Sequence, residues 1–103
     1  MKLKKVKIGN GYHYTVSVMV NGEPVIAIID SGANCTTFQN YSMEGVSIKF
    51  GRLRFLVKNT KTIPWGRITQ AYTESGQPVP ELIIGTDILN GCVIDLKKNI
   101  LSY

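Results

Sequence analysis

The sequence is poor in the residues that bind metals or form disulfides. It contains one histidine, His13, and two cysteines, Cys35 and Cys92, whose spacing matches no zinc motif. We therefore expect neither a metal nor another cofactor. The N-terminus lacks the apolar stretch of a secretion signal, so we expect no disulfide and no secretion.

Long apolar runs are also missing. No run approaches the roughly 18 residues of a membrane-spanning helix, so no membrane partner is expected. The chain of 103 residues, with 44% hydrophobic and 18% charged residues, has the composition of one globular domain over residues 1–103. A domain this short buries only a modest core, and oligomerisation would add to its stability.

Acidic residues are scarce beside basic ones. There are 7 Asp and Glu against 12 Lys and Arg, which gives a net charge of +5. Four of the cations lie in the first strand-like segment, where lysines discourage wrong pairing of an edge strand: Lys2, Lys4, Lys5 and Lys7. The alternative is a nucleic-acid surface, which Arg52, Arg54 and Arg67 would extend. Because no aromatic-rich binding signature accompanies these cations, we expect no nucleic-acid partner.

The pattern of apolar residues predicts a chain that is nearly all β. The run Tyr12–Val20 alternates and is followed by Asn21-Gly22, a strong hairpin signal. The returning run, Val25–Ile29, is apolar throughout, which predicts a strand buried on both faces. Asp30 stands at the end of this strand, where a rigid hairpin would position it.

Shorter patterns predict the remaining elements. A helical turn is expected at Thr86–Asn90, with Thr86 as its N-cap and Gly91 ending it. Loops are expected at Ser31–Thr37 and Glu74–Pro80, and a turn at residues 58–61. The other expected strands are Phe38–Met43 (strand or turn), Val46–Phe50, Leu53–Lys58, Arg67–Thr73, Leu82–Ile84, Val93–Leu96 and Ile100–Tyr103.

The segment Asp30-Ser31-Gly32 has two interpretations. These three residue types dominate ordinary turns. A carboxylate at the end of a buried strand is also partly removed from water, which makes it a candidate for acid–base chemistry. A second stretch, Pro80–Leu89, repeats the pattern of a proline, a short apolar strand, a glycine and an acid, and it favours the second interpretation.

Together the two stretches resemble the paired sequence boxes of retropepsin-like aspartic proteases, known from retroviruses, LTR retrotransposons and cellular relatives. The residues concerned are Asp30-Ser31-Gly32-Ala33 and Ile83-Ile84-Gly85-Thr86-Asp87-Ile88-Leu89. The resemblance implies an all-β, closed-barrel acid-protease fold with one short C-terminal helix. It also implies cleavage of peptide or polyprotein substrates, in the cytoplasm or inside a virus-like particle.

An Asp pair requires a second copy of the chain, because only Asp30 has the boxed context. Asp87 and Asp95 lack it. A two-fold axis would place Asp30 beside its own copy, and the resemblance implies such a homodimer. The segments Leu3–Ile8 and Val93–Tyr103 would interleave between the subunits and remove exposed strand edges.

The resemblance also suggests roles for the neighbours of Asp30. Ser31 would brace the paired loops, and Gly32 would let the backbone approach the substrate. Substrate would be bound by Ala33, Asn34 and pocket walls from Ile28, Val79, Glu81 and Ile83. A covering hairpin, or flap, is placed at Phe50, Gly51 and Arg52, with Trp65-Gly66 and the turn at Asn59 as alternatives, and plain core strands as a further one.

Two positions depart from the viral pattern. Asn34 and Thr86 stand where many retroviral proteases carry an ion pair, and a neutral hydrogen bond is expected instead. The loss of that pair bears on dimer stability. The alternative function is a catalytically weak or inactive retropepsin-fold domain for dimerisation or peptide binding.

Overall fold

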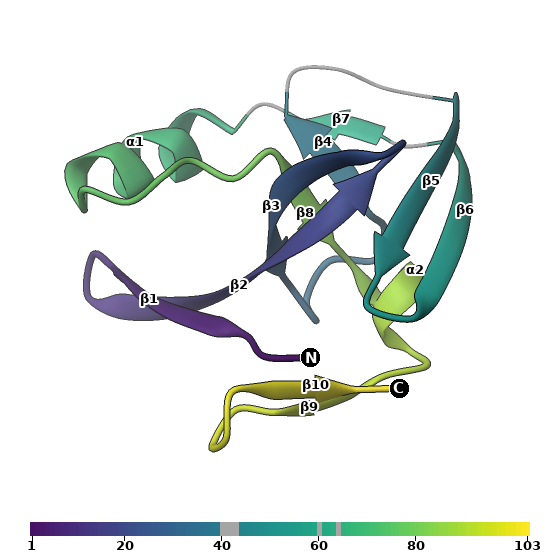
Figure 1. Ribbon diagram of the computed structural model, residues 1–103. Coiled ribbons are helices and arrows are strands. Elements are labelled where there is room, and N and C mark those ends of the chain that lie inside the picture. The colour runs from purple at the N-terminus through teal and green to yellow at the C-terminus, as the bar shows by residue number, and fades with distance from the viewer. Residues whose placement is uncertain (40–43, 60, 64) are drawn as a thin grey trace.

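A computed structural model of the chain describes residues 1–39, 44–59, 61–63 and 65–103 (Figure 1). The strands before the first helix are β1 (Lys4–Ile8), β2 (Gly11–Val20), β3 (Glu23–Ile29), β4 (Thr37–Gln39), β5 (Glu44–Phe50), β6 (Leu53–Asn59) and β7 (Lys61–Ile63). The elements that follow are α1 (Gly66–Glu74), β8 (Leu82–Ile84), α2 (Thr86–Leu89), β9 (Val93–Asp95) and β10 (Ile100–Ser102).

The β2–β3 hairpin forms as the sequence predicts. Asn21 and Gly22 both have positive φ, 48° and 87°, which is the backbone that a tight hairpin turn requires. The turn is also fixed to β5, because the Asn21 N–H donates to the Ser47 carbonyl and the Ser47 N–H donates to Asn21 Oδ1, both at 2.9 Å. The turn from which β3 begins is therefore fixed to β5.

The main sheet has the strand order β6-β5-β2-β3-β8-β4-β7, with β1 paired to β2 beside this path. In Figure 1 the sheet curls around its core into a half-barrel, and the closed barrel expected from the sequence is thus only partly formed. Strand β8 is parallel to β3 and antiparallel to β4. The loop from β3 to β4 must therefore cross the end of β8.

Alternation along β2 divides the sheet into two faces. Val16, Val18 and Val20 are buried in the main core with Phe38 and Phe50. Strand β3 is less buried than its apolar sequence predicts, because Ile26 is 37% exposed on the outer face. Burial on both faces is typical of a strand between two parallel neighbours. Strand β3 instead has the antiparallel β2 on one side and the parallel β8 on the other.

Helix α1 replaces the strand predicted over Arg67–Thr73. Its apolar residues Ile68, Ala71 and Tyr72 recur at the helical spacing i, i+3, i+4 and pack on a second core cluster with Trp65 and Ile83. The short segment fits both a strand and a helix, and packing decides between them. Among the described residues no helix is long and apolar enough to cross a membrane.

The short helix α2 begins one residue away from the predicted cap. Gly85 is the N-cap and makes no side-chain capping bond, while Thr86 is the first helical residue. The first two residues of the predicted segment Phe38–Met43 belong to β4, which ends at Gln39. Residues 40–43 lie outside the described residues. Residue 60 of the predicted turn at 58–61 does so too.

The two ends of the chain lie together at the bottom of Figure 1. Strand β9 pairs with β10 in a separate two-stranded sheet, and Lys2 bridges to Ile100. The Leu3 N–H donates to the Asn99 carbonyl at 2.7 Å, and the Leu101 N–H donates to the Met1 carbonyl at 2.8 Å. The terminal segments thus pair within one chain. Their interleaving between subunits stays a prediction.

Candidate active site

Asp30 lies immediately beyond the C-terminal end of β3. Its backbone N–H donates to the Ile84 carbonyl of the parallel strand β8 at 3.0 Å, which continues the β3–β8 pairing by one residue. The Asp30 side chain is exposed in the single chain. The partial removal from water expected from the sequence is therefore absent within one chain, and only a covering partner or substrate would supply it.

The loop after Asp30 turns back on the carboxylate. The Gly32 N–H donates to Asp30 Oδ1 at 2.9 Å, and the Ala33 N–H donates to the Asp30 carbonyl at 3.2 Å. A Cβ atom on Gly32 would lie 3.2 Å from Asp30 Oδ1, so a side chain there would crowd the carboxylate. One carboxylate oxygen is thus held by the backbone, and no described residue donates to Oδ2.

The junction between β8 and α2 contacts this loop and fixes it by hydrogen bonds. The Thr86 N–H and hydroxyl both donate to the Ala33 carbonyl, at 2.8 and 3.2 Å. Gly85 fits directly beneath the loop, since a Cβ atom there would lie 2.7 Å from the Ala33 oxygen and 2.8 Å from the Cys35 carbonyl carbon. The second sequence box thus positions the first.

Thr36 and Asp87 fix the far end of the loop. The Thr36 N–H donates to Asp87 Oδ2 at 2.9 Å, and its hydroxyl donates to Asp87 Oδ1 at 2.8 Å. The Thr36 oxygen also accepts from the Gly85 N–H at 3.3 Å. The sequence did not predict this role of Thr36, although Asp87 belongs to the second sequence box, Ile83–Leu89.

The neutral hydrogen bond expected between Asn34 and Thr86 is not the one that forms. Thr86 bonds to the Ala33 carbonyl, and the Asn34 side chain is exposed. The Ala33 carbonyl also accepts the Thr86 N–H at 2.8 Å, which holds it beside the Thr86 hydroxyl.

Two pockets open beside Asp30. The first, of about 240 Å³, is lined by Tyr12, His13, Tyr14, Ile28, Ile29, Asp30, Ile68 and Ile83. The second, of about 380 Å³, is lined by Tyr14, Ile29, Asp30, Ser31, Ile94 and Leu96. The first contains the polar side chain of His13, whereas the walls of the second are mainly apolar. Asp30 stands where the two pockets meet.

The structure places only some of the expected substrate residues at these pockets. Ile28 and Ile83 line the first pocket, and Ser31, which was predicted to brace the loop, lines the second. Val79 packs against the second core cluster, and Glu81 is exposed with its backbone bonded to the Ile26 carbonyl. The pockets also contain seven residues that were not predicted as site residues, Tyr12, His13, Tyr14, Ile29, Ile68, Ile94 and Leu96.

The hairpin tip that was predicted to be the flap does not line either pocket beside Asp30. Phe50 is fully buried in the main core. The Arg52 N–H donates to the Tyr103 hydroxyl at 2.8 Å, and Gly51 lies against Tyr103 and Met1. None of these three residues lines a pocket with Asp30. Of the alternatives, Trp65-Gly66 lies at the start of α1, the helix that contributes Ile68 to the first pocket.

His13 and Tyr72 form a polar pair behind the first pocket. His13 Nδ1 lies 2.7 Å from the Tyr72 hydroxyl, and their rings are tilted at 56° with centroids 5.3 Å apart. Burial raises the pKa of Tyr72 to about 12, because the charged phenolate would be removed from water. The Tyr72 hydroxyl therefore stays protonated over the usual range of pH.

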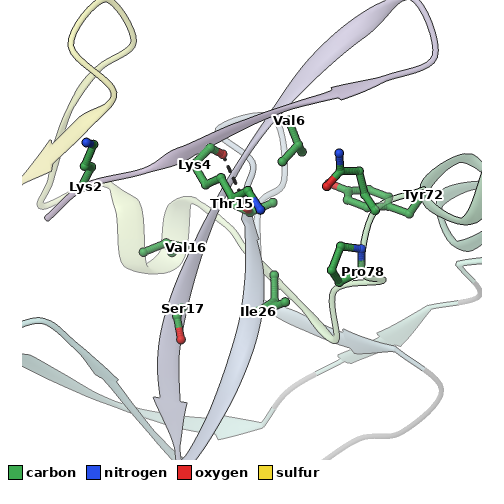
Figure 2. A pocket seen from close by; sticks show the side chains of 10 residues that line it. Lys2, Lys4, Val6, Thr15, Val16, Ser17, Ile26, Tyr72 and Pro78 are labelled. Atoms are coloured by element: carbon green, nitrogen blue, oxygen red, sulfur yellow. Dashed lines mark hydrogen bonds between the residues drawn. The ribbon is translucent and has the colours of Figure 1, made fainter. Parts of the chain in front are cut away.

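A third pocket, of about 240 Å³, is shown in Figure 2, and Asp30 is not among the described residues that line it. Its walls come from Lys2, Lys4, Val6, Thr15, Val16, Ser17, Ile26, Tyr72, Gln77 and Pro78. Tyr72 borders this pocket and also bonds to His13 at the first one. Among the described residues, none that lines the third pocket carries a carboxylate. Within the described residues no group of three or more His, Cys, Asp or Glu could hold a metal ion.

Comparison with solved structures identifies the fold. The chain is similar to the retroviral protease-like domain of Ddi1 from Leishmania major, with 18% identity, a TM-score of 0.59 and 85% of each chain covered. It is also similar to a retropepsin-like aspartic protease from Rickettsia conorii, with 12% identity, a TM-score of 0.57, and 98% of this chain and 93% of that chain covered. No family model and no curated protein sequence matches the chain. The chain thus has the fold of retropepsin-like aspartic protease domains.

Proposed function

We propose that the chain is an aspartic endopeptidase, with Asp30 from each of two copies forming the catalytic pair. One observation supports this most directly. Asp30 is an exposed carboxylate at the junction of two pockets, and its loop is fixed by the β8–α2 junction. An ordinary turn gives no reason for an exposed carboxylate to be fixed by the backbone beside two pockets.

A second carboxylate is not available within the described part of one chain. Asp87 is engaged by Thr36, and Asp95 Oδ1 accepts the backbone N–H groups of Lys97 and Lys98 at 3.0 and 3.1 Å. No described carboxylate other than Asp30 lines either pocket. A second copy is therefore the source that the proposal requires.

The two-stranded sheet β9–β10 supports the same arrangement. The sheet exposes Val93 and Ile100, and the residues that directly follow its two strands, Leu96 and Tyr103, are exposed as well; Val93 is 69% exposed. Leu96 also lines the second pocket with Asp30. A copy that covered this sheet would bury apolar surface and close that pocket at the same time.

The chemistry follows from two carboxylates that share one proton, since both cannot be ionised cheaply at close range. The ionised carboxylate takes a proton from a water molecule, whose oxygen attacks the peptide carbon. The protonated carboxylate donates to the carbonyl oxygen. The tetrahedral intermediate then breaks at the C–N bond. The leaving nitrogen takes the proton that the first carboxylate accepted from water, and the second carboxylate regains a proton from a hydroxyl of the intermediate. No covalent enzyme intermediate forms.

Substitution of Asp30 by Asn tests the proposal. Peptide-library cleavage is measured across pH for the wild-type chain and for Asp30→Asn, and sedimentation shows whether both variants form the same dimer. We expect cleavage by the wild type and none by a variant that still dimerises. Cleavage retained by Asp30→Asn would contradict the proposal, and so would a wild-type chain that stays monomeric while cleaving.

The alternative function is a retropepsin-fold domain that binds peptides or dimerises without cleaving them. The position of the β5–β6 tip favours it, because that tip is held by Tyr103 and covers neither pocket. The same library experiment separates the two functions. Peptide binding by the wild type without any cleavage would support this alternative.

A further inference from the structure

The first pocket beside Asp30 holds one polar group among apolar walls. Ile28, Ile68 and Ile83 come from β3, α1 and β8, and they converge with the imidazole of His13 on β2. Tyr12 and Tyr14 flank His13 along the strand. A side chain that entered this pocket would meet aliphatic surface and one ring with hydrogen-bonding capacity.

The hydrogen bond between Tyr72 and His13 bears on which ring nitrogen of His13 carries the proton. The Tyr72 side chain is 1% exposed, so its hydroxyl proton requires an acceptor inside the protein. His13 Nδ1, at 2.7 Å, is the acceptor that the described residues offer. When the Tyr72 O–H donates to Nδ1, a neutral imidazole carries its proton on Nε2.

This arrangement turns His13 into a hydrogen-bond donor. No described residue accepts from Nε2, so its N–H is available to a bound molecule. We propose that the first pocket is a substrate subsite in which His13 Nε2–H selects a neutral accepting side chain, such as the carboxamide of Gln or Asn. The inference rests on the proposed peptidase function and adds its substrate class.

The charge of the site separates a carboxamide from a carboxylate. Asp30 lines the same pocket, and a catalytic pair that shares one proton carries a negative charge. A Glu or Asp side chain would be repelled by that charge, whereas a carboxamide presents the same accepting oxygen without it. A Leu side chain would fit the apolar walls but leave the Nε2–H unpaired.

Matched peptides measure this selection. Peptides that differ only by Gln or Leu at each position flanking the cleaved bond are compared by kcat/KM. At one position we expect the wild type to prefer Gln over Leu about tenfold, the effect of leaving a buried donor unpaired. The His13→Phe variant keeps an aromatic ring without a donor, and its ratio should fall to about one, while His13→Gln should restore part of it.

Two further variants separate His13 from its surroundings. Tyr12→Phe removes a hydroxyl at the same pocket and should keep the preference for Gln. In Tyr72→Phe the ring of His13 loses its positioning bond, so the preference should weaken through KM. An unchanged ratio in His13→Phe would overturn the inference, as would a ratio that Tyr12→Phe abolishes.

A spectroscopic measurement does not depend on activity. Because the chain has a single histidine, the imidazole ¹⁵N resonances belong to His13 without further assignment. We expect the wild type to show the Nε2–H form and Tyr72→Phe to show a mixture of both forms. A wild type in the Nδ1–H form would contradict the inference.

Failure of the proposed function would be distinct from failure of this subsite. If the wild type cleaves no peptide, the proposed function fails, and binding of the Gln and Leu peptides is compared by fluorescence anisotropy. Tighter binding of the Gln peptide that is lost in His13→Phe would still support the subsite. Equal binding of the two peptides would overturn it.

Discussion

Thr36 and Asp87 are joined by two hydrogen bonds, from the Thr36 N–H and hydroxyl to the two carboxylate oxygens, at 2.9 and 2.8 Å. They stand 51 positions apart in the sequence. The link ties the loop that begins at Asp30 to helix α2. The position of the loop that carries the exposed Asp30 therefore depends on the buried Thr36, which leads to the first prediction.

Replacement of Thr36 by Val should destabilise the chain by about 1–3 kcal/mol, because the hydroxyl is lost while the Asp87 carboxylate and the Gly85 N–H each lose a partner. Thr36→Ser retains the hydroxyl and is the matched control, with a smaller loss that reflects only the missing methyl group. Urea unfolding measures both variants. Equal stability of Thr36→Val and Thr36→Ser would show that the hydroxyl contributes nothing.

A methyl group at Gly85 should disturb the loop by steric contact. The added Cβ would lie 2.7 to 2.8 Å from backbone atoms of Ala33 and Cys35, which cannot move aside independently. We expect Gly85→Ala to cost about 1–3 kcal/mol or more in unfolding free energy and to lower kcat. Gly66→Ala is the control, since nothing lies within 4 Å of its Cβ position and alanine favours the helix.

The sequence predicts the local parts of this architecture better than the distant ones. The hairpin at Asn21-Gly22 and the strands on either side depend on neighbouring residues, and they form as expected. The bond between Thr36 and Asp87 depends on β8 lying between β3 and β4, and no local pattern encodes that order. Helix α1 was predicted as a strand because its apolar spacing fits both periods over so few residues.

The pocket residues show the same limit. Ile28 and Ile83 were predicted because they adjoin the two boxes, and both line the first pocket. His13 and Ile68 reach that pocket from β2 and α1, whose approach depends on tertiary packing. The sequence marks His13 only by its two tyrosine neighbours, and that pattern does not distinguish a pocket residue from an ordinary strand residue.

The bond between Tyr103 and Arg52 tests whether the β5–β6 tip takes part in the proposed reaction. Tyr103→Phe removes the hydroxyl that accepts the Arg52 N–H, so stability should fall by about 1 kcal/mol. Since the tip lines neither pocket, kcat/KM should stay at the wild-type value. A large fall in kcat/KM without loss of dimer would instead show that the tip reaches the substrate.

The raised pKa of Tyr72 predicts a loss of stability in alkaline solution. Its pKa rises from 10.0 to about 12 on folding, so the folded state keeps the proton that the unfolded state releases. This stabilisation is complete below pH 10, falls as the pH rises from 10 to 12, and amounts to about 2–3 kcal/mol in total. Unfolding at several alkaline pH values, compared with Tyr72→Phe, isolates this residue. Parallel curves for the two proteins would contradict the prediction.

The exposed face of β9–β10 leads to the last prediction, which concerns the proposed dimer. Val93 is 69% exposed and would be buried by a second copy on this face. A charge there would be costly to bury, so Val93→Asp should shift the chain toward monomer and lower cleavage in parallel, although Asp30 is intact. Leu56→Asp is the matched control, because Leu56 is 71% exposed on β6 and lines neither pocket. If sedimentation velocity shows Val93→Asp to be monomeric and still fully active at the same concentration, the catalytic pair cannot arise from two copies of Asp30.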